Sequence, residues 1–470
     1  MENTLQKSLD SALNLDRVFD IKRRPVRLLN RNGVLTFVIG YTDQHLTERI
    51  LSFLMQIPEN EGENIASMDE LYKAHIPFGS CETTPDPIFA AEEILRGSAA
   101  LTLAGMSDIL LLDLRNFSMR GIEEPEKDRT LRGPHIGTNE NLLSNIIQIR
   151  RLVRCANLQT EKFLLGSEIK NEVALLSIRG KADEKLLEKI RTKLNHCRLK
   201  NLSMTQETLA GFLFPRKGLE ILNPFPKTRY TERPDVIASS LMEGKIALVC
   251  DNTPSVLLIP QSLFDFFEET DDYYFPPLTA SYLRLIRALV FLGSVFMIPL
   301  WLFLVKQKDI LPTNLEFLMA KDPFTVPLFL QFLIIEFAID GLKMASLNTP
   351  TTLSGSFSVI GGLLLGEYAV KSGWFVPQTI LYSAFTGIAN FIPTNIELAY
   401  SFKFMRISLI LLLEFFGLWG LISGTAFWLL ILALTKGNMG KSYLFPFFPF
   451  HRKGIEKILF RTRWGREREL

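Results

Sequence analysis

The run ALVFLGSVFMIPLWLFLV, residues Ala288–Val305, divides the chain into two unlike parts. It contains 18 residues and no charge, and about 20 apolar residues in a helix span the hydrocarbon core of a bilayer. Three comparable apolar runs follow it, whereas the residues before Arg287 are charged and mixed as in a water-soluble protein. We therefore expect a large soluble front part followed by an all-α polytopic membrane domain.

Five segments after Arg287 are candidate membrane helices. Four of them are expected to cross the bilayer: 288–305, 353–370, 374–392 and 407–434. The fifth, 324–341, carries Gln331, Glu336 and Asp340 and is bounded by prolines and a glycine. Since charged side chains are costly in lipid, this segment is expected to be interfacial or buried in protein. If it does span, one of the other segments must be re-entrant.

Basic residues flank the predicted membrane domain on both sides. Arg284 and Arg287 stand directly before the first span, and the tail after Leu434 is strongly basic. Because positive charge favours the cytoplasmic side, both flanks and the soluble front are expected in the cytoplasm. Residues 1–30 are charged and lack an apolar core, so no signal peptide is expected.

Composition favours neither a metal site nor nucleic acid. The formal net charge is +2, and the front part has no basic run with interleaved aromatic residues. The cysteines lie far apart without CxxC spacing, and the five histidines are scattered. The cysteines are therefore expected to be buried and reduced, and no cofactor or metal is expected.

The front part contains a repeat. The stretch GVLTFVIGYTDQHLTERI, Gly33–Ile50, aligns without gaps on VALLSIRGKADEKLLEKI, Val173–Ile190. In both copies a β-rich strand ends at a glycine, and an Asp two or three residues later can cap the next helix. A strand followed by a helix is therefore predicted in each copy.

A second pair of stretches repeats at a slightly larger offset. LRGSAALTLAGMSDILLL, Leu95–Leu112, lies on MEGKIALVCDNTPSVLLI, Met242–Ile259. Each resembles the end of a helix, a glycine and a β-hairpin. Two related α/β lobes are therefore predicted; the alternative is chance similarity of two strand-turn-helix segments. The predicted domains are lobe one with its linker (1–150), lobe two (151–284), the membrane domain (285–440) and a basic cytoplasmic tail (441–470).

No motif in the front part predicts catalysis. Phosphate-binding glycine loops, HExxH and GxSxG are all absent from the sequence. The densest charge cluster is RYTERPD, Arg229–Asp235, and such a cluster is more often a salt-bridged turn than an active site. The protein is therefore not expected to be an enzyme.

The order of motifs, starting at this cluster, resembles the A subunits of GerA-type spore germination receptors. The resemblance continues through Glu243–Leu248, Asp272–Tyr274 and Arg284 into the membrane segments, where Ser358–Val370 is similar to a Gly-rich membrane helix of that family. The family-motif residues of the cluster are Thr231, Glu232, Arg233, Pro234 and Asp235. The chain departs from the family at Glu367, where Gln is usual, and in the linker from Arg132 to Glu140, which lacks an Arg and an acid.

This resemblance implies a nutrient-sensing receptor subunit in the inner membrane of a bacterial spore. Such A subunits work with a transporter-like, nutrient-binding B subunit and a lipoprotein C subunit. They are thought to form a homo-oligomeric ring that conducts ions when germination starts. The resemblance thus implies a membrane-bound ion channel.

The segment 353–370 is the candidate pore helix. Its glycines and serines permit close helix packing, and its other side carries the pore-lining candidates Val359, Leu363, Gly366, Glu367 and Val370. Apolar rings at Val359 and Leu363 can dewet when shut, and a ring of Glu367 favours cations. Alternatively, Glu367 bonds a neighbouring helix and the glycines serve packing only.

Three further acids, Glu336, Asp340 and Glu414, are candidates for an intramembrane ion route. Glu336 and Asp340 are one helical turn apart with Lys343 close by. An internally neutralised cluster is the more ordinary interpretation.

Two other functions remain open from the sequence. A secondary transporter acting alone needs inverted repeats around a midplane site, whereas the repeat lies in the soluble part. A membrane-anchored signalling scaffold needs one span rather than four. If the channel interpretation holds, Arg284, Arg287 and the first span could pass movement of the lobes to the membrane domain.

Overall fold

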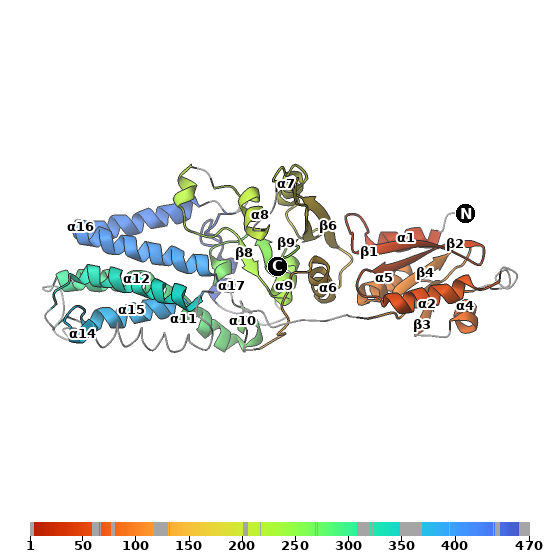
Figure 1. Ribbon diagram of the computed structural model, residues 1–470, viewed down its shortest axis with the longest axis horizontal. Coiled ribbons are helices and arrows are strands. Elements are labelled where there is room, and N and C mark those ends of the chain that lie inside the picture. Colours follow the sequence, from red (N-terminus) through yellow and green to blue (C-terminus); the bar gives the residue numbers. More distant parts are fainter. Residues whose placement is uncertain are drawn as a thin grey trace. The chain divides into compact units, whose positions relative to one another are not determined.

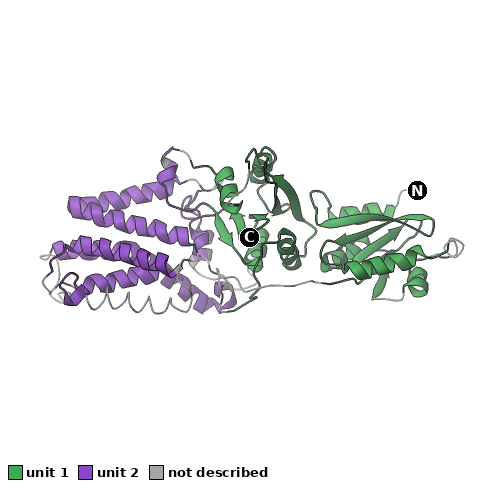
Figure 2. Cartoon of the chain, in the orientation of Figure 1, with its two compact units in different colours: residues 1–215, 228–260 green, residues 216–227, 261–470 purple. Residues whose placement is uncertain are grey.

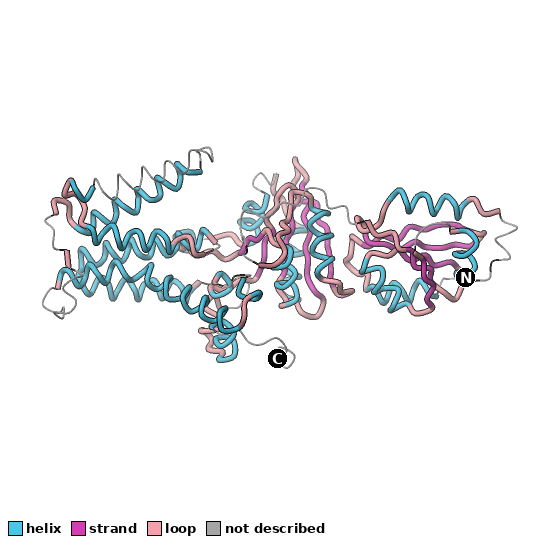
Figure 3. The backbone as a smooth tube through the Cα atoms, turned by 90° about the horizontal axis from the view of Figure 1, so that it is seen from below, coloured by secondary structure: helices cyan, strands magenta, loops and turns pink. Residues whose placement is uncertain are grey.

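The computed structural model describes residues 4–58, 65, 67–76, 80–116, 130, 132–200, 205–216, 218–267, 269, 271–307, 319–320, 324–347, 369–393, 395–435, 437 and 442–459. They form two compact units (Figure 2). The front unit comprises residues 1–215 and 228–260, and the helical unit comprises residues 216–227 and 261–470. All strands named below belong to the front unit, in magenta in Figure 3.

Lobe one of the front unit is an antiparallel sheet with helices (Figure 1). Its elements are α1 (Thr4–Leu13), β1 (Ile21–Leu28), β2 (Arg31–Val38), α2 (Gln44–Met55), α4 (Met68–His75), β3 (Cys81–Thr84), α5 (Pro87–Arg96), β4 (Ala99–Leu103) and β5 (Ile109–Leu112). The strand order is β1-β2-β4-β5-β3, and every neighbouring pair is antiparallel.

Lobe two repeats this order of elements. It consists of α6 (Leu142–Leu152), β6 (Leu158–Leu165), β7 (Asn171–Ile178), α7 (Glu184–Asn195), α8 (Thr205–Leu213), β8 (Arg229–Thr231), α9 (Pro234–Met242), β9 (Ile246–Cys250) and β10 (Val256–Ile259). The strand order β6-β7-β9-β10-β8 matches that of lobe one. The predicted duplication is confirmed. In the first aligned pair of stretches β2 and α2 correspond to β7 and α7, and in the second pair β4 and β5 correspond to β9 and β10.

The strand-to-helix turn is built alike in both lobes. Gly40 and Gly180 follow β2 and β7 with φ of 77° and 80°, a left-handed conformation that favours glycine. Three residues later Asp43 and Asp183 cap α2 and α7 by accepting hydrogen bonds from main-chain N–H groups, Asp43 from Leu46 at 3.0 Å. These bonds lower the pKa of Asp43. The predicted glycine and capping aspartate are thus confirmed in both copies.

Helices cover both faces of each sheet, and they bury its inner strands. In lobe one, alternate strand residues pack against α2 and α4 on one face and against α1 and α5 on the other. In lobe two, α6 and α9 cover the face that corresponds to α1 and α5. Side chains alternate across a strand, so a sheet with two covered faces needs apolar residues throughout. Strands β4, β5, β9 and β10 are buried along their whole length.

The two lobes are joined by a buried ion pair that sequence patterns did not indicate. Asp20, before β1, is paired with Arg150 of α6, and both side chains are almost wholly buried. Arg150 also donates at 2.8 Å to the second oxygen of Asp20, which accepts from the Thr160 hydroxyl of β6 at 2.5 Å. The main chains of Phe19 and Thr160 are bonded at 3.1 Å. Lobe one is therefore fixed to both α6 and β6.

The described part of the helical unit consists of helices and short turns. They are η1 (Gly218–Leu222), η2 (Phe264–Phe266), α10 (Asp271–Tyr274), α11 (Pro277–Lys306), α12 (Leu328–Leu347), α14 (Ala369–Lys371), α15 (Pro377–Ala389), α16 (Ile396–Leu434) and α17 (Arg452–Leu459). In the described residues, α11 and α16 are long and apolar enough to cross a membrane. α12 has 20 residues with three charged ones, and α15, within the predicted span 374–392, has only 13.

The predicted span 407–434 contains a reversal of the chain, because α16 folds back on itself. At Gly417 the backbone takes φ 60° and ψ −143°, which is not helical. The Trp428 indole nitrogen donates to the Ser408 hydroxyl at 2.7 Å, although 20 residues of straight helix would separate them by about 30 Å. α16 is therefore a hairpin with arms 396–416 and 418–434, in two shades of blue in Figure 1. Only a residue without a Cβ adopts this turn easily.

The helical unit also includes residues that the sequence assigned to lobe two. Residues 216–227 leave the front unit between α8 and β8, and the helical unit resumes at Gln261 rather than near residue 285. The cause is burial of Phe225, Leu263 and Phe266 in the core of the helical unit. Composition could not show this, since these residues stand in a charged stretch.

Candidate functional site

A buried ion cluster lies between three helices of the helical unit. Glu336 stands about half way along α12, and Lys403 and Arg406 lie on the first arm of α16. All three side chains are nearly inaccessible to solvent, at 4% exposure or less. Helices that are mainly apolar thus share a buried group of charges.

The cluster has close geometry on both oxygens of Glu336. Arg406 Nε donates to Oε1 at 2.7 Å, and Lys403 Nζ lies 3.0 Å from Oε2. Lys403 also lies 2.7 Å from Asp340, which is partly exposed. Arg406 donates from its other nitrogen to the carbonyl of Ser294 on α11 at 2.7 Å. Two acids and two bases therefore bind α11, α12 and α16 together without net charge.

The neutralised cluster favoured by the sequence has different partners from those expected. Lys343 was the expected base, but its ammonium lies over the rings of Phe391 and Tyr400, 5.2 Å from each centroid. The bases that pair with Glu336 and Asp340 are Lys403 and Arg406. Because the first arm of α16 begins at Ile396, these two residues lie inside a helix rather than at the flank of a span.

The third intramembrane acid, Glu414, is paired at the end of the bundle. Its carboxylate lies 2.8 Å from the Lys306 ammonium, at the last residue of α11. Both side chains are partly exposed. Glu414 therefore shares no base with Glu336 and Asp340. Its ion pair with Lys306 joins the first arm of α16 to the end of α11 instead.

The pore-lining candidates fall mostly outside the described residues. Val359, Leu363, Gly366 and Glu367 lie in residues 348–368, which the structure does not describe. Val370 is half-buried in the short helix α14. The assignment of 353–370 as a pore helix stays a prediction.

A neutral polar contact joins α12 to the start of α15. The Gln331 side chain, wholly buried, accepts from the main chain of Val376 at 3.0 Å and from the Thr379 hydroxyl at 2.9 Å. Its nitrogen donates to the carbonyl of Val326 at 2.8 Å. This explains why an amide stands among apolar residues of 324–341.

The TERPD cluster forms a salt-bridged turn at the start of α9. Arg233, 1% exposed, pairs through two nitrogens with both oxygens of Asp235, at 3.0 and 2.7 Å. It also donates to Thr130 at 2.5 Å and to the carbonyl of Pro134 at 3.3 Å. The cluster therefore holds the linker on lobe two.

The other members of this cluster serve the same turn. Thr231 ends β8 and Pro234 is the first residue of α9. Glu232 accepts from the Ser255 hydroxyl at 2.9 Å, and its carbonyl accepts from the main chain of Thr138 at 2.8 Å. The salt-bridged turn, which the sequence favoured over an active site, is what the structure contains.

Arg284 and Arg287 are held by acids that precede α11. Asp272 of α10 is fully buried, and it accepts from Arg284 at 3.0 Å and from Arg287 at 3.1 Å. Arg287 also lies 2.9 Å from Glu269 and donates to the carbonyl of Phe267 at 2.6 Å. The two arginines therefore fix the start of α11 as well as marking a basic flank.

Residues 216–227 insert an aromatic side chain into the helical unit. Phe225 is fully buried against Phe402 on the first arm of α16, Trp428 on the second arm and Tyr443. The carbonyl of Pro226 accepts from the Tyr443 hydroxyl at 2.8 Å, and that of Pro224 accepts from Ser401 at 2.7 Å.

Asn223 adds to this contact by donating to the hydroxyl of Thr435, the residue directly after the second arm, at 2.7 Å. We call residues 216–227 the insert. It touches both arms of α16 and the segment after them, and it continues into the front unit at each end.

Sequence patterns missed the base Lys403 and the insert, and they did not indicate that Arg406 pairs with Glu336 or that Asp272 pairs with Arg284 and Arg287. The sequence did contain a signal for the two bases. Lys403 and Arg406 are three residues apart, and Glu336 and Asp340 are four residues apart, so each pair lies on one face of its helix. Among the described residues, no group of three or more His, Cys, Asp or Glu side chains could hold a metal ion.

Comparison with known proteins gives consistent matches over most of the chain. Residues 7–469 match the family described as Bacillus/Clostridium GerA spore germination protein. Stage V sporulation protein AF of Bacillus subtilis (strain 168) is 28% identical over 444 residues, which cover 94% of this chain and 89% of that protein. Spore germination protein KA of the same organism is 29% identical over 454 residues, covering 95% and 82%.

A solved structure is also similar, the N-terminal domain of the A subunit of the Bacillus megaterium spore germinant receptor GerK3. It is 21% identical with a TM-score of 0.40, over 54% of this chain and 92% of that one.

Proposed function

Because the chain belongs to the Bacillus/Clostridium GerA spore germination protein family, we propose that it is the A subunit of a nutrient-responsive receptor. In this proposal it is a multi-pass protein of the spore inner membrane with its front unit in the cytoplasm. It works with a transporter-like, nutrient-binding B subunit and a lipoprotein C subunit, and it catalyses no reaction. The family relation and the two apolar helices α11 and α16 support this location.

We further propose that several copies of the helical unit form a path for cations that opens when germination begins. The observation that carries this proposal is the buried cluster of Glu336, Lys403 and Arg406. A bundle that served only as a lipid anchor would not need buried charges, which are costly in an apolar environment. The cluster joins α11, α12 and α16 to one another, and in this proposal the predicted segment 353–370 lines the path.

Ion flux from vesicles tests the channel. The purified full chain is reconstituted in vesicles loaded with potassium, and efflux is followed with an ion-sensitive dye. Efflux from the wild type, with altered cation selectivity in Glu367→Gln and faster leak in Leu363→Ala, is expected. The matched control is Glu414→Gln, whose acid already pairs with Lys306. Unchanged flux and selectivity in both variants of 353–370 would remove the pore assignment.

The cluster has its own test in paired substitutions. Arg406→Leu leaves the buried carboxylate of Glu336 with one base fewer, and loss of one partner from a buried ion pair costs about 3–5 kcal/mol. The double variant Glu336→Gln, Arg406→Leu removes the unpaired charge and should recover most of this stability. If the double variant melts no higher than Arg406→Leu alone, the pair does not hold the helices together.

A route for coupling follows from the insert and from Arg284 and Arg287. The insert is continuous with α8 and β8 of lobe two and packs on both arms of α16. The two arginines hold the start of α11 on Asp272. We propose that movement of lobe two reaches the helices through these two places. Spores that carry Phe225→Ala or Arg287→Gln and germinate normally would contradict this route.

A secondary transporter acting alone is the second candidate. The short helix α15 favours it, since unusually short or interrupted helices mark solute sites in transporters. Crosslinking of the purified chain in detergent separates the two functions. A closed oligomer is expected for the channel, and a persistent monomer favours the transporter.

A further inference from the structure

The segment that follows the hairpin of α16 exposes three aromatic rings. Residues 446–450, PFFPF, lie in the turn before α17. Phe447, Phe448 and Phe450 are 46%, 66% and 74% exposed, whereas phenylalanine is among the residues most often buried. Exposed apolar side chains that lie together mark interaction surfaces. We call residues 446–450 the aromatic turn.

The aromatic turn is a folded part of the helical unit. The main-chain N–H groups of Phe447 and Phe448 both donate to the carbonyl of Leu444, at 2.8 and 3.1 Å. The Phe447 ring stacks on that of Phe264, with centroids 4.7 Å apart. The exposed rings thus belong to an ordered turn rather than to a frayed chain end.

The aromatic turn and α17 both lie at the start of α11. Phe264, which the turn contacts, has its ring centroid 6.4 Å from that of Phe267, and the carbonyl of Phe267 accepts from Arg287 of α11 at 2.6 Å. α17 packs on α11, and the carbonyl of Ile458 accepts from Arg284 at 3.5 Å. The aromatic turn and α17 therefore flank the end of α11 at which the predicted span begins.

One face of α11 is apolar and exposed from its first turn onward. The residues of this face recur every three or four positions and are each more than half exposed: Leu278, Tyr282, Leu285, Leu289 and Leu292. Arg284 and Arg287 are buried elsewhere on the helix. In the proposed membrane protein this face contacts lipid, so the aromatic turn lies beside the place where α11 enters the bilayer.

The charge of α17 complements an anionic surface. The helix contains three bases, Arg452, Lys453 and Lys457. Its one acid, Glu456, lies 3.0 Å from Arg452, so three bases less one acid leave the sequence of α17 with two positive charges in excess. Ile455 and Ile458 are half-buried. Helices that are apolar on one face and rich in Lys and Arg lie in the headgroup layer of membranes.

We propose that the aromatic turn and α17 bind anionic phospholipids at the membrane surface. Phe448 and Phe450 enter the boundary between headgroups and acyl chains, and the bases of α17 attract the lipid phosphate groups. The inference rests on the membrane location proposed above. The bases also favour this partner over a second copy of the chain, because its matching segment would carry the same charge.

Lipid bound at this surface would also support the place where the insert is held. Tyr443, three residues before the aromatic turn, donates to the carbonyl of Pro226 at 2.8 Å and packs on Phe225. An aromatic turn fixed in the membrane surface keeps Tyr443 in this position. The lipid site therefore stabilises the contact of the insert with the helical unit.

Quenching by brominated phospholipid tests whether the rings enter lipid. The full chain is reconstituted in nanodiscs that contain phosphatidylglycerol and a lipid brominated near the headgroup end of its acyl chains. The emission of the wild type, which has five tryptophans, is subtracted from that of Phe448→Trp. The added emission should be mostly quenched. The matched control is Phe53→Trp, at a 38% exposed phenylalanine of lobe one, whose added emission should not be quenched.

Leu289→Trp, on the exposed face of α11, separates this inference from the proposed membrane location. Its added emission should be quenched in the same nanodiscs. Quenching at position 289 without quenching at position 448 would overturn the lipid site and leave the membrane location standing. Absence of quenching at both positions would contradict the membrane location as well.

Hydrogen exchange tests the part played by charge. Exchange at residues 443–459 should be slower in nanodiscs of phosphatidylcholine with phosphatidylglycerol than in nanodiscs of phosphatidylcholine alone. The double variant Lys453→Gln, Lys457→Gln should reduce this slowing by about fivefold for each base, the contribution of one base near an anionic surface.

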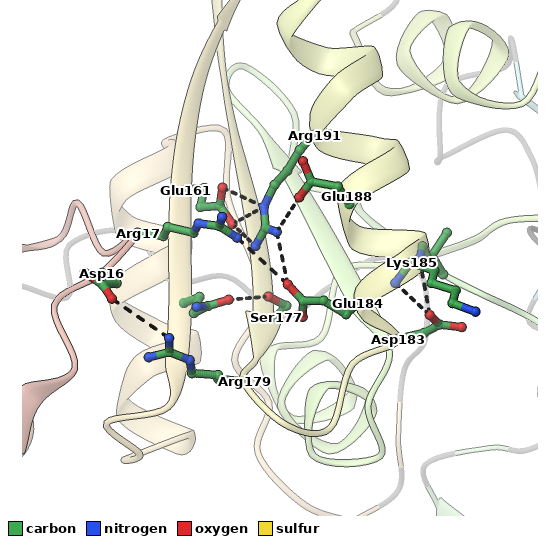
Figure 4. A network of polar contacts seen from close by, with 12 residues as sticks. Asp16, Arg17, Glu161, Ser177, Arg179, Asp183, Glu184, Lys185, Glu188 and Arg191 are labelled. Atoms are coloured by element: carbon green, nitrogen blue, oxygen red, sulfur yellow. Dashed lines mark hydrogen bonds and ion pairs between the residues drawn. The ribbon is translucent and has the colours of Figure 1, made fainter.

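The matched control for charge is the double variant Lys185→Gln, Lys189→Gln, at two exposed lysines four residues apart on α7. Figure 4 shows Lys185 at the start of α7, where its main-chain N–H donates to Asp183 at 2.9 Å. The substitution leaves this helix cap in place, and exchange at residues 443–459 should equal that of the wild type.

Three results of the exchange experiment would overturn the proposal. The first is equal exchange at residues 443–459 in the two kinds of nanodisc. The second is an equal effect of the two double variants on this exchange. The third is exchange that slows with protein concentration instead of lipid charge, which would indicate a second copy of the chain as the partner.

Discussion

Lobe one and lobe two have the same order of elements, yet only lobe two sends a segment into the helical unit. The connection between α4 and β3 in lobe one runs from Ile76 to Ser80, whereas between α8 and β8 in lobe two it runs from Phe214 to Thr228 and contains the insert. The offset between the copies is larger after this region than before it, because the connection is longer in lobe two. One copy of the duplicated lobe thus contains a connection to the helical unit that the other copy lacks.

The comparison also shows how burial differs between the copies. The lobe-one sheet forms its core from its own helices, and lobe two does the same. The insert contributes nothing to either sheet, because its Phe225 is buried among residues of the helical unit. The difference teaches that the fold of the lobe accommodates the insert without a change of strand order.

The largest expected effect is that of Phe225→Ala. Removal of a fully buried phenylalanine costs about 3–5 kcal/mol, and here it leaves a cavity between both arms of α16 and Tyr443. Thermal melting and the fluorescence of Trp428, whose ring is 6.1 Å from that of Phe225, measure the loss.

Phe53→Ala in lobe one is the control for this prediction. Phe53 lies on α2 and is 38% exposed, so its removal should cost about 1 kcal/mol or less. Equal losses in the two variants would mean that Phe225 does not hold the insert in the core of the helical unit.

The matched glycines of the two lobes give the next effect. Alanine at a left-handed position costs about 1–2 kcal/mol, and this applies to Gly180→Ala, where a Cβ meets nothing within 4 Å. In Gly40→Ala the Cβ would lie 2.1 Å from the end of the Ile147 side chain of α6, which adds about 1–3 kcal/mol. Denaturant unfolding of the two variants should rank Gly40→Ala as less stable. The reverse order would contradict the packing of α6 on lobe one.

A smaller effect is expected from Ser401→Ala. The Ser401 hydroxyl lies 2.7 Å from the carbonyl of Pro224 in the insert and 2.8 Å from that of Glu397 in its own helix, and loss of the bond to the insert costs about 1 kcal/mol. Ser281→Ala on α11 is the control, since its hydroxyl bonds within its own helix. Ser401→Ala should lower the melting temperature more than Ser281→Ala, and no difference between them would weaken the hydrogen-bonded part of the anchor.

Thiol reactivity gives the smallest effect and changes no stability. Burial, and secondarily a nearby aspartate, raises the pKa of Cys81 in lobe one to about 11 and that of Cys250 in lobe two to about 12. Alkylation of both should therefore be slow at pH 8 and rise with pH, because only the thiolate reacts. Cys81, half-buried, should react faster than Cys250, which is buried. Mass spectrometry of the alkylated protein measures the two rates.

Much of the front unit could be predicted because its signals are local. Gly40 and Asp43, like their counterparts Gly180 and Asp183 in lobe two, fix a turn and a helix cap, and the hairpins follow from short apolar strands around a polar turn. The ion pair between Asp20 and Arg150 could not be predicted, because the two residues are far apart in the sequence and no periodic pattern relates them.

The helical unit was less predictable for a physical reason. Hydropathy marks apolar length, but it does not show which charges pair or where a helix turns back. Gly417 is one glycine in a long apolar run. In the sequence Lys403 and Arg406 look like the basic flank of a membrane span, whereas in the structure they lie inside α16, which begins at Ile396. Phe225 carries no membrane signal at all, because it stands between two prolines in a short stretch that lacks an apolar run.

The central claim is that the insert of lobe two holds the hairpin of α16. Hydrogen exchange of the full chain in detergent, wild type against Phe225→Ala, tests it most directly. The account predicts faster exchange in the arms 396–416 and 418–434 of the variant, with unchanged exchange in β1, β2, β4 and β5 of lobe one. Unchanged exchange in both arms would contradict the account.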